Sequence, residues 1–134
     1  MRYLRAESPA FLKGHEAARR FFAACFESQD QRHEHLLVAH VDGNSRCLHL
    51  ERYSGDAAEV GIPVRAIIAD ALRLGSAGVI VAHNHPSGDS RPSEADYRAT
   101  RKLARAGETI DLAVLDHLIF AERDSSSMRW MGLL

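Results

Sequence analysis

An almost unbroken apolar run near the middle of the chain constrains the fold more than any other feature. Residues 77–83, AGVIVAH, contain no Asp, Glu, Lys or Arg and come shortly after Gly75, a residue type typical of helix ends. A strand that is apolar at nearly every position is buried on both of its faces, so this run predicts the central strand of a covered sheet. The remainder of the chain must then supply the cover.

Periodic patterns on either side of the run provide helices and further strands. Apolar residues at helical spacing follow Ser8 and Pro9, which suit an N-cap and a first helical turn, and similar spacing follows Pro63. The turn signal at residues 42–44, Asp-Gly-Asn, joins two short strand-like segments, as in a β-hairpin. The expected helices span residues 8–27, 63–75 and 93–107, and the expected strands span residues 34–41, 45–52, 77–83, 110–115 and 117–121.

The order of these segments predicts an α/β fold in which a mixed β-sheet is flanked by helices, in a single domain over residues 1–134. In the C-terminal tail, Met128, Trp130 and Met131 are expected to pack back onto the core. Cys25 and Cys47 belong to no C-x-x-C pair, so we expect two free thiols and neither a cysteine metal site nor a redox motif.

Charge and hydropathy narrow the classes of partner. The formal net charge is −1 and the sequence pI is about 6.7, so no global attraction draws the chain to nucleic acid or to an acidic membrane surface. No apolar run approaches the length of a membrane span, and residues 1–13 lack the apolar core of a signal peptide. We expect a cytoplasmic protein without strong nucleic-acid binding. One local exception is a basic helix face formed by Arg98, Arg101, Lys102 and Arg105.

The residues that carry chemistry lie where the central strand ends. His83 and His85 are two positions apart, so they share a face of the strand and can direct both imidazoles at one metal ion. The chain then reverses through a loop, and Asp96 arrives in the first turn of the next expected helix. Two imidazole nitrogens and one carboxylate oxygen are the three protein ligands of a catalytic zinc, which keeps a further position for water.

Several of these residues have plainer interpretations. Ser93 and Asp96 fit the capping-box pattern, in which both side chains secure the start of a helix, and position alone does not separate a cap from a ligand. A second H-x-H pair, His33 and His35, precedes a strand and is expected on the surface. His117 is either a partner of the metal ligands or a structural residue, and we leave it unassigned.

The motif resembles a known signature. The JAMM signature of JAB/MPN metalloproteases reads H-x-H-P, a spacer and S-x-x-D, and here ten residues separate His85 from Asp96 as that signature requires. The chain is still more similar to the RadC-like branch over roughly residues 10–134. The matching residues are His83 to Asp89, Pro92, Ser93, Asp96, Thr100, Asp116 to Ile119 and Gly132 to Leu134.

This resemblance implies a fold and a metal site. The fold is that of JAB/MPN domains, which is related to the cytidine-deaminase-like core. The resemblance implies a zinc ion with His83, His85 and Asp96 as ligands, and a role for Ser93 in stabilising a tetrahedral intermediate.

The resemblance also implies a general base, a glutamate at the start of a strand, and Glu34 matches that place. From the residues alone, Glu34, Glu51 and Glu59 all stay open for this role, because a base need only reach the water that it activates.

We therefore expect a zinc-dependent hydrolase that acts on peptide or isopeptide bonds of a peptide or protein substrate. Two alternatives stay open: a nucleic-acid-processing or DNA-binding module, and a non-catalytic domain that keeps its zinc as a scaffold. A salt-sensitive DNA complex would favour the first alternative. Loss of function without loss of fold in a Glu34 mutant would argue against the second.

Overall fold

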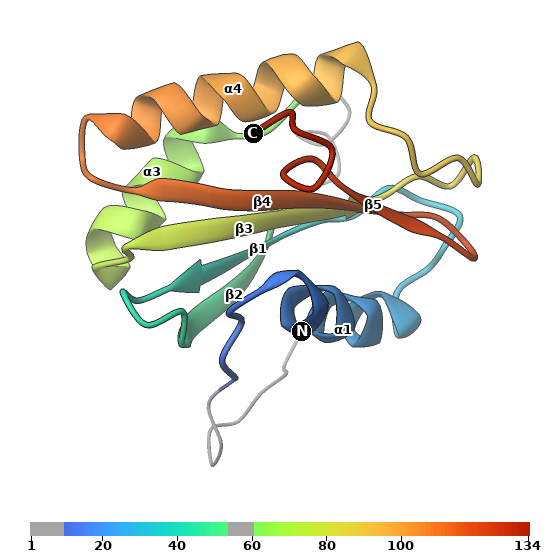
Figure 1. The fold of residues 1–134 in the computed structure, drawn as a ribbon, viewed down its shortest axis with the longest axis horizontal. Coiled ribbons are helices and arrows are strands. Elements are labelled where there is room, and N and C mark those ends of the chain that lie inside the picture. The colour runs from blue at the N-terminus through green and yellow to red at the C-terminus, as the bar shows by residue number, and fades with distance from the viewer. Residues whose placement is uncertain (1–9, 54–60) are drawn as a thin grey trace.

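The computed structural model describes residues 10–53 and 61–134. In this part of the chain, one five-stranded sheet has the order β2-β1-β3-β4-β5, with α1 on one face and α3 and α4 on the other (Figure 1). The elements are α1 (His15–Glu27), β1 (Leu36–Val41), β2 (Cys47–Tyr53), α3 (Val64–Leu74), β3 (Gly78–Asn84), α4 (Glu94–Glu108), β4 (Ala113–Phe120) and β5 (Ser125–Ser127). The predicted mixed α/β sheet flanked by helices is confirmed.

The central strand is β3, as the apolar run predicts. It is buried at every position, and it pairs antiparallel with β1 and parallel with β4. Its side chains alternate between the two helical layers: Val79 and Val81 pack in the cluster that contains residues of α3 and α4, and Ile80 and Ala82 pack in the cluster that contains residues of α1. Burial on both faces explains why nearly the whole strand is apolar.

Helix α1 begins later than expected. Ser8 and Pro9 lie outside the described residues, and the helix starts only at residue 15, after Gly14 with its φ of 91°. The segment before it pairs with the hairpin: the Leu12 N–H donates to the Ser45 carbonyl at 2.8 Å. The expected helical start is therefore wrong, because these backbone groups find partners in another segment.

Strand β4 replaces the two strands expected at 110–115 and 117–121. The register to β3 shifts between Val79 and Ile80, whose partners are Val114 and Asp116, so Leu115 is an extra residue in the ladder. Such a β-bulge interrupts the alternation of side chains without ending the strand. The break in the pattern is thus a bulge, and the second residue after it, His117, pairs with Val81 and contacts Thr100 of α4.

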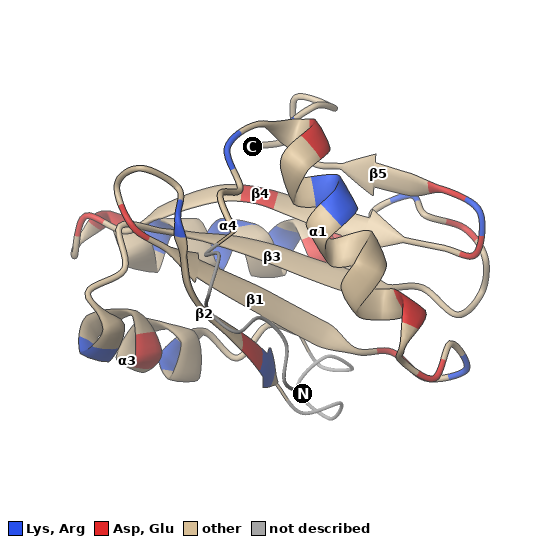
Figure 2. Ribbon diagram, turned by 90° about the horizontal axis from the view of Figure 1, so that it is seen from below, with Lys and Arg blue, Asp and Glu red and all other residues tan. Residues whose placement is uncertain are grey.

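The C-terminal tail packs on the core through one residue. Met128 is fully buried, whereas Trp130 and Met131 are 76% and 50% exposed, so the expectation for these two is wrong. Both cysteines are free thiols, as predicted. Charged side chains lie on the helices, the loops, β2 and β4, while β1 and β3 carry none (Figure 2). Among the described residues, no helix has the length and apolar character needed to cross a bilayer.

Candidate metal centre

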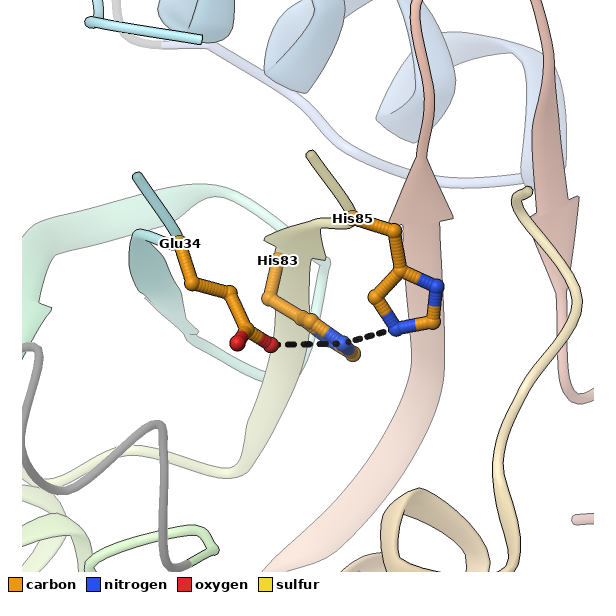
Figure 3. A group of neighbouring side chains, drawn as sticks. All are labelled: Glu34, His83 and His85. Carbon is orange, nitrogen blue, oxygen red and sulfur yellow. Dashed lines mark hydrogen bonds and ion pairs between the residues drawn. The ribbon is translucent and has the colours of Figure 1, made fainter. Parts of the chain in front are cut away.

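The start of β1 and the end of β3 bring the predicted site residues together. The two strands are antiparallel with Leu36 opposite His83, so Glu34 comes opposite His85 as the chain continues beyond the pair. Because side chains alternate along a strand, these residues continue the sheet face that α3 and α4 cover. Figure 3 shows Glu34, His83 and His85 pointing toward one another.

Three side chains of this sheet face and one side chain of α4 lie close together. His83 Nε2 lies 2.9 Å from His85 Nε2 and 3.7 Å from Glu34 Oε2, and one ligand atom from each of these three residues lies within 4.8 Å of the others. Asp96 completes the group from the first turn of α4: its Oδ1 is 3.5 Å from His83 Nε2, and its Oδ2 is 3.2 Å from His85 Nε2. The group therefore contains two imidazoles and two carboxylates.

This donor set fits a metal ion. His85 Nδ1 lies 2.8 Å from the Asp89 carbonyl oxygen, which can only accept, so Nδ1 carries the ring hydrogen when the ring is neutral. The lone pair on the Nε2 of a neutral His85 then faces His83 Nε2 at 2.9 Å, an approach that a metal ion bound to both nitrogens would make favourable. Imidazole nitrogen with carboxylate oxygen is a ligand combination that suits zinc.

The protonation states of His83 and Asp96 suit metal ligands. Burial lowers the pKa of His83 to about 4, so this imidazole is neutral at pH 7. A hydrogen bond with Asp96 raises the pKa of His85. Burial by itself would raise the pKa of Asp96, but its contacts with His85 and His83 lower that pKa below the ordinary range. An ionised carboxylate beside a neutral imidazole is the state that binds a metal ion.

The cap of α4 holds the Asp96 carboxylate in place. Ser93 is the N-cap: its Oγ accepts from the Asp96 N–H at 3.0 Å, and its own N–H donates to Asp96 Oδ2 at 2.9 Å. The capping box is present, yet the same Oδ2 faces His85. The two interpretations of Asp96 are therefore compatible, since the cap fixes the carboxylate that points into the site. Ser93 keeps its hydroxyl hydrogen as a donor.

A cavity of about 410 Å³ opens over the group. Its polar lining includes Glu34, Ser93 and the residues already described, and its described lining contains no Lys or Arg. The rest of the wall is largely apolar: besides Ser87 and Gly61, it consists of Leu36, Ile62, Pro86, Ala95 and Ala99. The cavity thus combines an anionic centre with a neutral wall.

Among the glutamates, Glu34 is the one at this centre in the described part of the chain. Glu51 lies on β2 and pairs with His49 at 2.7 Å, and Glu59 is outside the described residues. The two residues of the second H-x-H pair differ in burial. The His33 side chain is 72% exposed, as expected. His35 is buried, and its Nε2 donates to the Asp30 carbonyl. The surface expectation for His35 is wrong because strand β1 begins next to it.

Three residues around the centre were not assigned from the sequence. Asn84 is buried, and its amide bonds to the backbone on both sides of Glu34: Oδ1 accepts from the His35 N–H at 2.6 Å, and Nδ2 donates to the His33 carbonyl at 2.9 Å. His117 and Thr100 contact the site from behind His83. The only signal for Asn84 was a polar residue between two histidines of a motif.

Comparison with known proteins shows the family of this chain. The sequence matches the family model described as RadC-like JAB domain over residues 12–133. The chain belongs to the RadC-like JAB domain family. This RadC-like domain is 36% identical over 110 residues to a UPF0758 protein of Pelobacter propionicus. The alignment covers 81% of the chain and 48% of that relative.

Two further relatives are UPF0758 proteins of Chloroflexus aggregans and Chlorobium chlorochromatii, each 38% identical, over 101 and 106 residues that cover 75% and 78% of the chain. Those alignments cover 44% and 48% of these relatives, so the RadC-like domain spans about half the length of the curated proteins that it matches. The resemblance drawn from the H-x-H-P motif is confirmed.

Proposed function

We propose that this domain is a zinc-dependent hydrolase of peptide or isopeptide bonds. In this proposal His83, His85 and Asp96 hold the metal, and Glu34 is the general base. The observation that carries it is the convergence of two imidazole Nε2 atoms and two carboxylates in one cavity that also contains the Ser93 hydroxyl.

When bound, the zinc ion supplies a Lewis acid that polarises a carbonyl and acidifies water. The residues of the chain transfer the protons and stabilise the developing negative charge. The Glu34 carboxylate takes a proton from the attacking water and later returns it to the leaving amine. The Ser93 O–H donates to the carbonyl oxygen as negative charge develops there. The apolar cavity wall holds a neutral substrate chain, and the absence of Lys and Arg from its described lining disfavours a phosphate-bearing substrate.

Two carboxylates lie near the imidazoles, and the proposal gives them different roles. A ligand is needed for metal binding, whereas a base is needed only for turnover. Asp96→Ala should therefore lower zinc affinity by more than the 10–100-fold typical of residues behind the ligands. Glu34→Gln should keep zinc, and cleavage should fall by about 10²–10⁴-fold. Zinc affinity is measured by competition with a chromophoric chelator, and cleavage by mass spectrometry on a mixed peptide library.

Ser93→Ala is the matched control for the capping role of Asp96. It removes the cap at a cost of about 0.5–2 kcal/mol and leaves the ligand set in place, so zinc affinity should change far less than in Asp96→Ala. If Glu34→Gln loses zinc and Asp96→Ala retains it, the two carboxylates exchange roles. Tight zinc binding by a wild-type domain that cleaves no peptide would support the scaffold alternative.

A further inference from the structure

A chain of buried hydrogen bonds runs from the metal centre to the backbone of α4. His83 Nδ1 lies 2.8 Å from His117 Nε2, and His117 Nδ1 lies 2.6 Å from Thr100 Oγ1. Thr100 Oγ1 in turn lies 2.7 Å from the Asp96 carbonyl oxygen. Thr100 is 0% and His117 is 1% exposed, so water does not compete for these groups.

The direction of every bond in this chain follows from its last member. The Asp96 carbonyl can only accept, so Thr100 donates its single hydroxyl hydrogen there. The Met128 sulfur, 3.7 Å away, is a much weaker acceptor for that hydrogen. Thr100 Oγ1 must then accept from His117, which places the ring hydrogen of His117 on Nδ1.

The same logic continues to the metal centre. A neutral imidazole has one ring hydrogen, so His117 Nε2 has a lone pair and accepts from His83 Nδ1. The ring hydrogen of His83 is thereby held on Nδ1, and its Nε2 presents a lone pair to His85, Asp96 and the cavity. Imidazole ligands need such an orienting partner on their second nitrogen.

We propose that Thr100 and His117 are positioning residues that fix the tautomer of His83 and so prepare its Nε2 for a metal ion. The inference rests on the proposed function only for the identity of the metal as zinc. The bulge at Leu115 is part of this device, because it sets the register in which His117, two residues further along β4, lies opposite Val81 on the face that α4 covers. Neither residue need touch substrate for this role.

Removing the Thr100 hydroxyl should reverse the direction of the hydrogen bonds between His117 and His83. Thr100→Val leaves the His117 Nδ1–H buried without its acceptor, and an unsatisfied buried donor is costly. Moving that hydrogen to His117 Nε2 makes this atom a donor to His83 Nδ1. His83 must then carry its own hydrogen on Nε2, where it opposes metal binding. Thr100→Ser keeps the hydroxyl and should keep the direction of these hydrogen bonds.

The test combines a tautomer measurement with zinc affinity. Long-range ¹H–¹⁵N NMR of the imidazole rings, recorded on the metal-free domain, should show the hydrogen on Nδ1 in both His83 and His117 of the wild type. Thr100→Val should shift both rings toward the Nε2–H tautomer and weaken zinc binding by about 10–100-fold. Thr100→Ser should restore both properties. Thr109→Val removes an exposed hydroxyl that bonds the Ala106 carbonyl at 2.8 Å in the same helix, and should change neither.

Two results would overturn the inference. One is a wild-type His83 that carries its hydrogen on Nε2, a measurement that needs no variant to fold. The other is a folded Thr100→Val whose tautomers and zinc affinity equal those of Thr109→Val. If the wild type shows the expected tautomers but binds no zinc, the relay of hydrogen bonds is supported and the proposed zinc hydrolase is not.

Discussion

At the scale of single residues, Asn84 connects the two strands that build the candidate metal centre. It lies between His83 and His85, the two proposed histidine ligands, yet its side chain points to the other face of β3 and bonds the backbone of His33 and His35. Glu34 is the residue between those two backbone groups. Asn84 therefore holds the carboxylate of the proposed base in position without entering the site.

Replacing Asn84 should affect the position of the proposed base, Glu34, more than the binding of zinc by the proposed ligands. Asn84→Ala leaves one buried N–H and one carbonyl without partners, and we expect the free energy of unfolding to fall by about 1–3 kcal/mol. Zinc affinity should fall much less than in Asp96→Ala, because all three proposed ligands remain. Urea unfolding and chelator competition measure the two effects. A loss of zinc as large as in Asp96→Ala would mean that Asn84 orients the ligands themselves.

At the scale of elements, the junction of α4 and β4 determines where Thr100 and His117 meet. Gly107 lies in the last turn of α4, and its carbonyl accepts from the Leu112 N–H at 2.9 Å. A Cβ added at Gly107 would lie 2.5 Å from the Leu112 carbonyl oxygen, which is backbone and cannot simply rotate away. The helix can therefore approach the strand only with glycine at this place.

Gly107→Ala should accordingly destabilise the domain by about 1–3 kcal/mol, the range for overpacked sites. A loss of stability would be informative, because helix propensity alone favours alanine over glycine in a helix interior by about 1 kcal/mol and so predicts a gain. Gly43→Ala is the matched control, since a Cβ there meets nothing within 4 Å. Chemical denaturation of the two variants should show a loss at Gly107 only. Equal stability of both variants would show that the turn after α4 relaxes without strain.

At the scale of the whole molecule, a buried histidine couples folding to pH. His40 is fully buried on β1, where its ring bonds Ser76 and Tyr53. Burial lowers the pKa of His40 from its ordinary value of 6.5 to about 4. Between these two values the unfolded chain binds a proton that the folded His40 does not. Stability must therefore fall as the pH drops through this window, by at most about 1.4 kcal/mol per pH unit for one group.

His40→Gln should remove the contribution of His40 to the pH dependence of the free energy of unfolding. We expect the free energy of unfolding of the wild type to decrease more steeply between pH 6.5 and 4.5 than that of the variant, with a slope difference approaching one proton. His83 and His117, whose pKa values burial also lowers, contribute equally in both proteins. Urea titrations at several pH values measure the slopes. Parallel slopes would show that His40 is protonated in the folded state.

The outer face of α4 bears on the nucleic-acid alternative. A shallow groove there is lined by Tyr97, Arg98, Arg101, Lys102 and Arg105. Arg98 pairs with Glu94 at 3.5 Å, and the whole chain has a formal net charge of −1. We expect no tight DNA complex in a gel shift with micromolar protein at physiological salt. A complex that weakens as salt rises and disappears in Lys102→Glu would contradict this expectation.

Local periodicity determined much of this protein. The apolar run fixed β3 as the central strand, and alternation along it placed His83 and His85 on one face. Gly75 ends α3 in the left-handed conformation, with a φ of 71°, as its residue type predicts. These features depend on neighbours within a few positions of the chain, so the sequence alone is enough to infer them.

Only the tertiary structure decided which distant residues complete the site. Glu34 stands at the centre because Asn84 bonds the backbone of residues 49 and 51 positions away, and no local pattern specifies that pairing. The alternation along β4 is readable from the sequence, but its interruption is equally typical of a strand end, and only the ladder with β3 identifies it as a bulge. Strand register and helix docking depend on how all the side chains pack together, and they alone bring His117 and Thr100 behind His83.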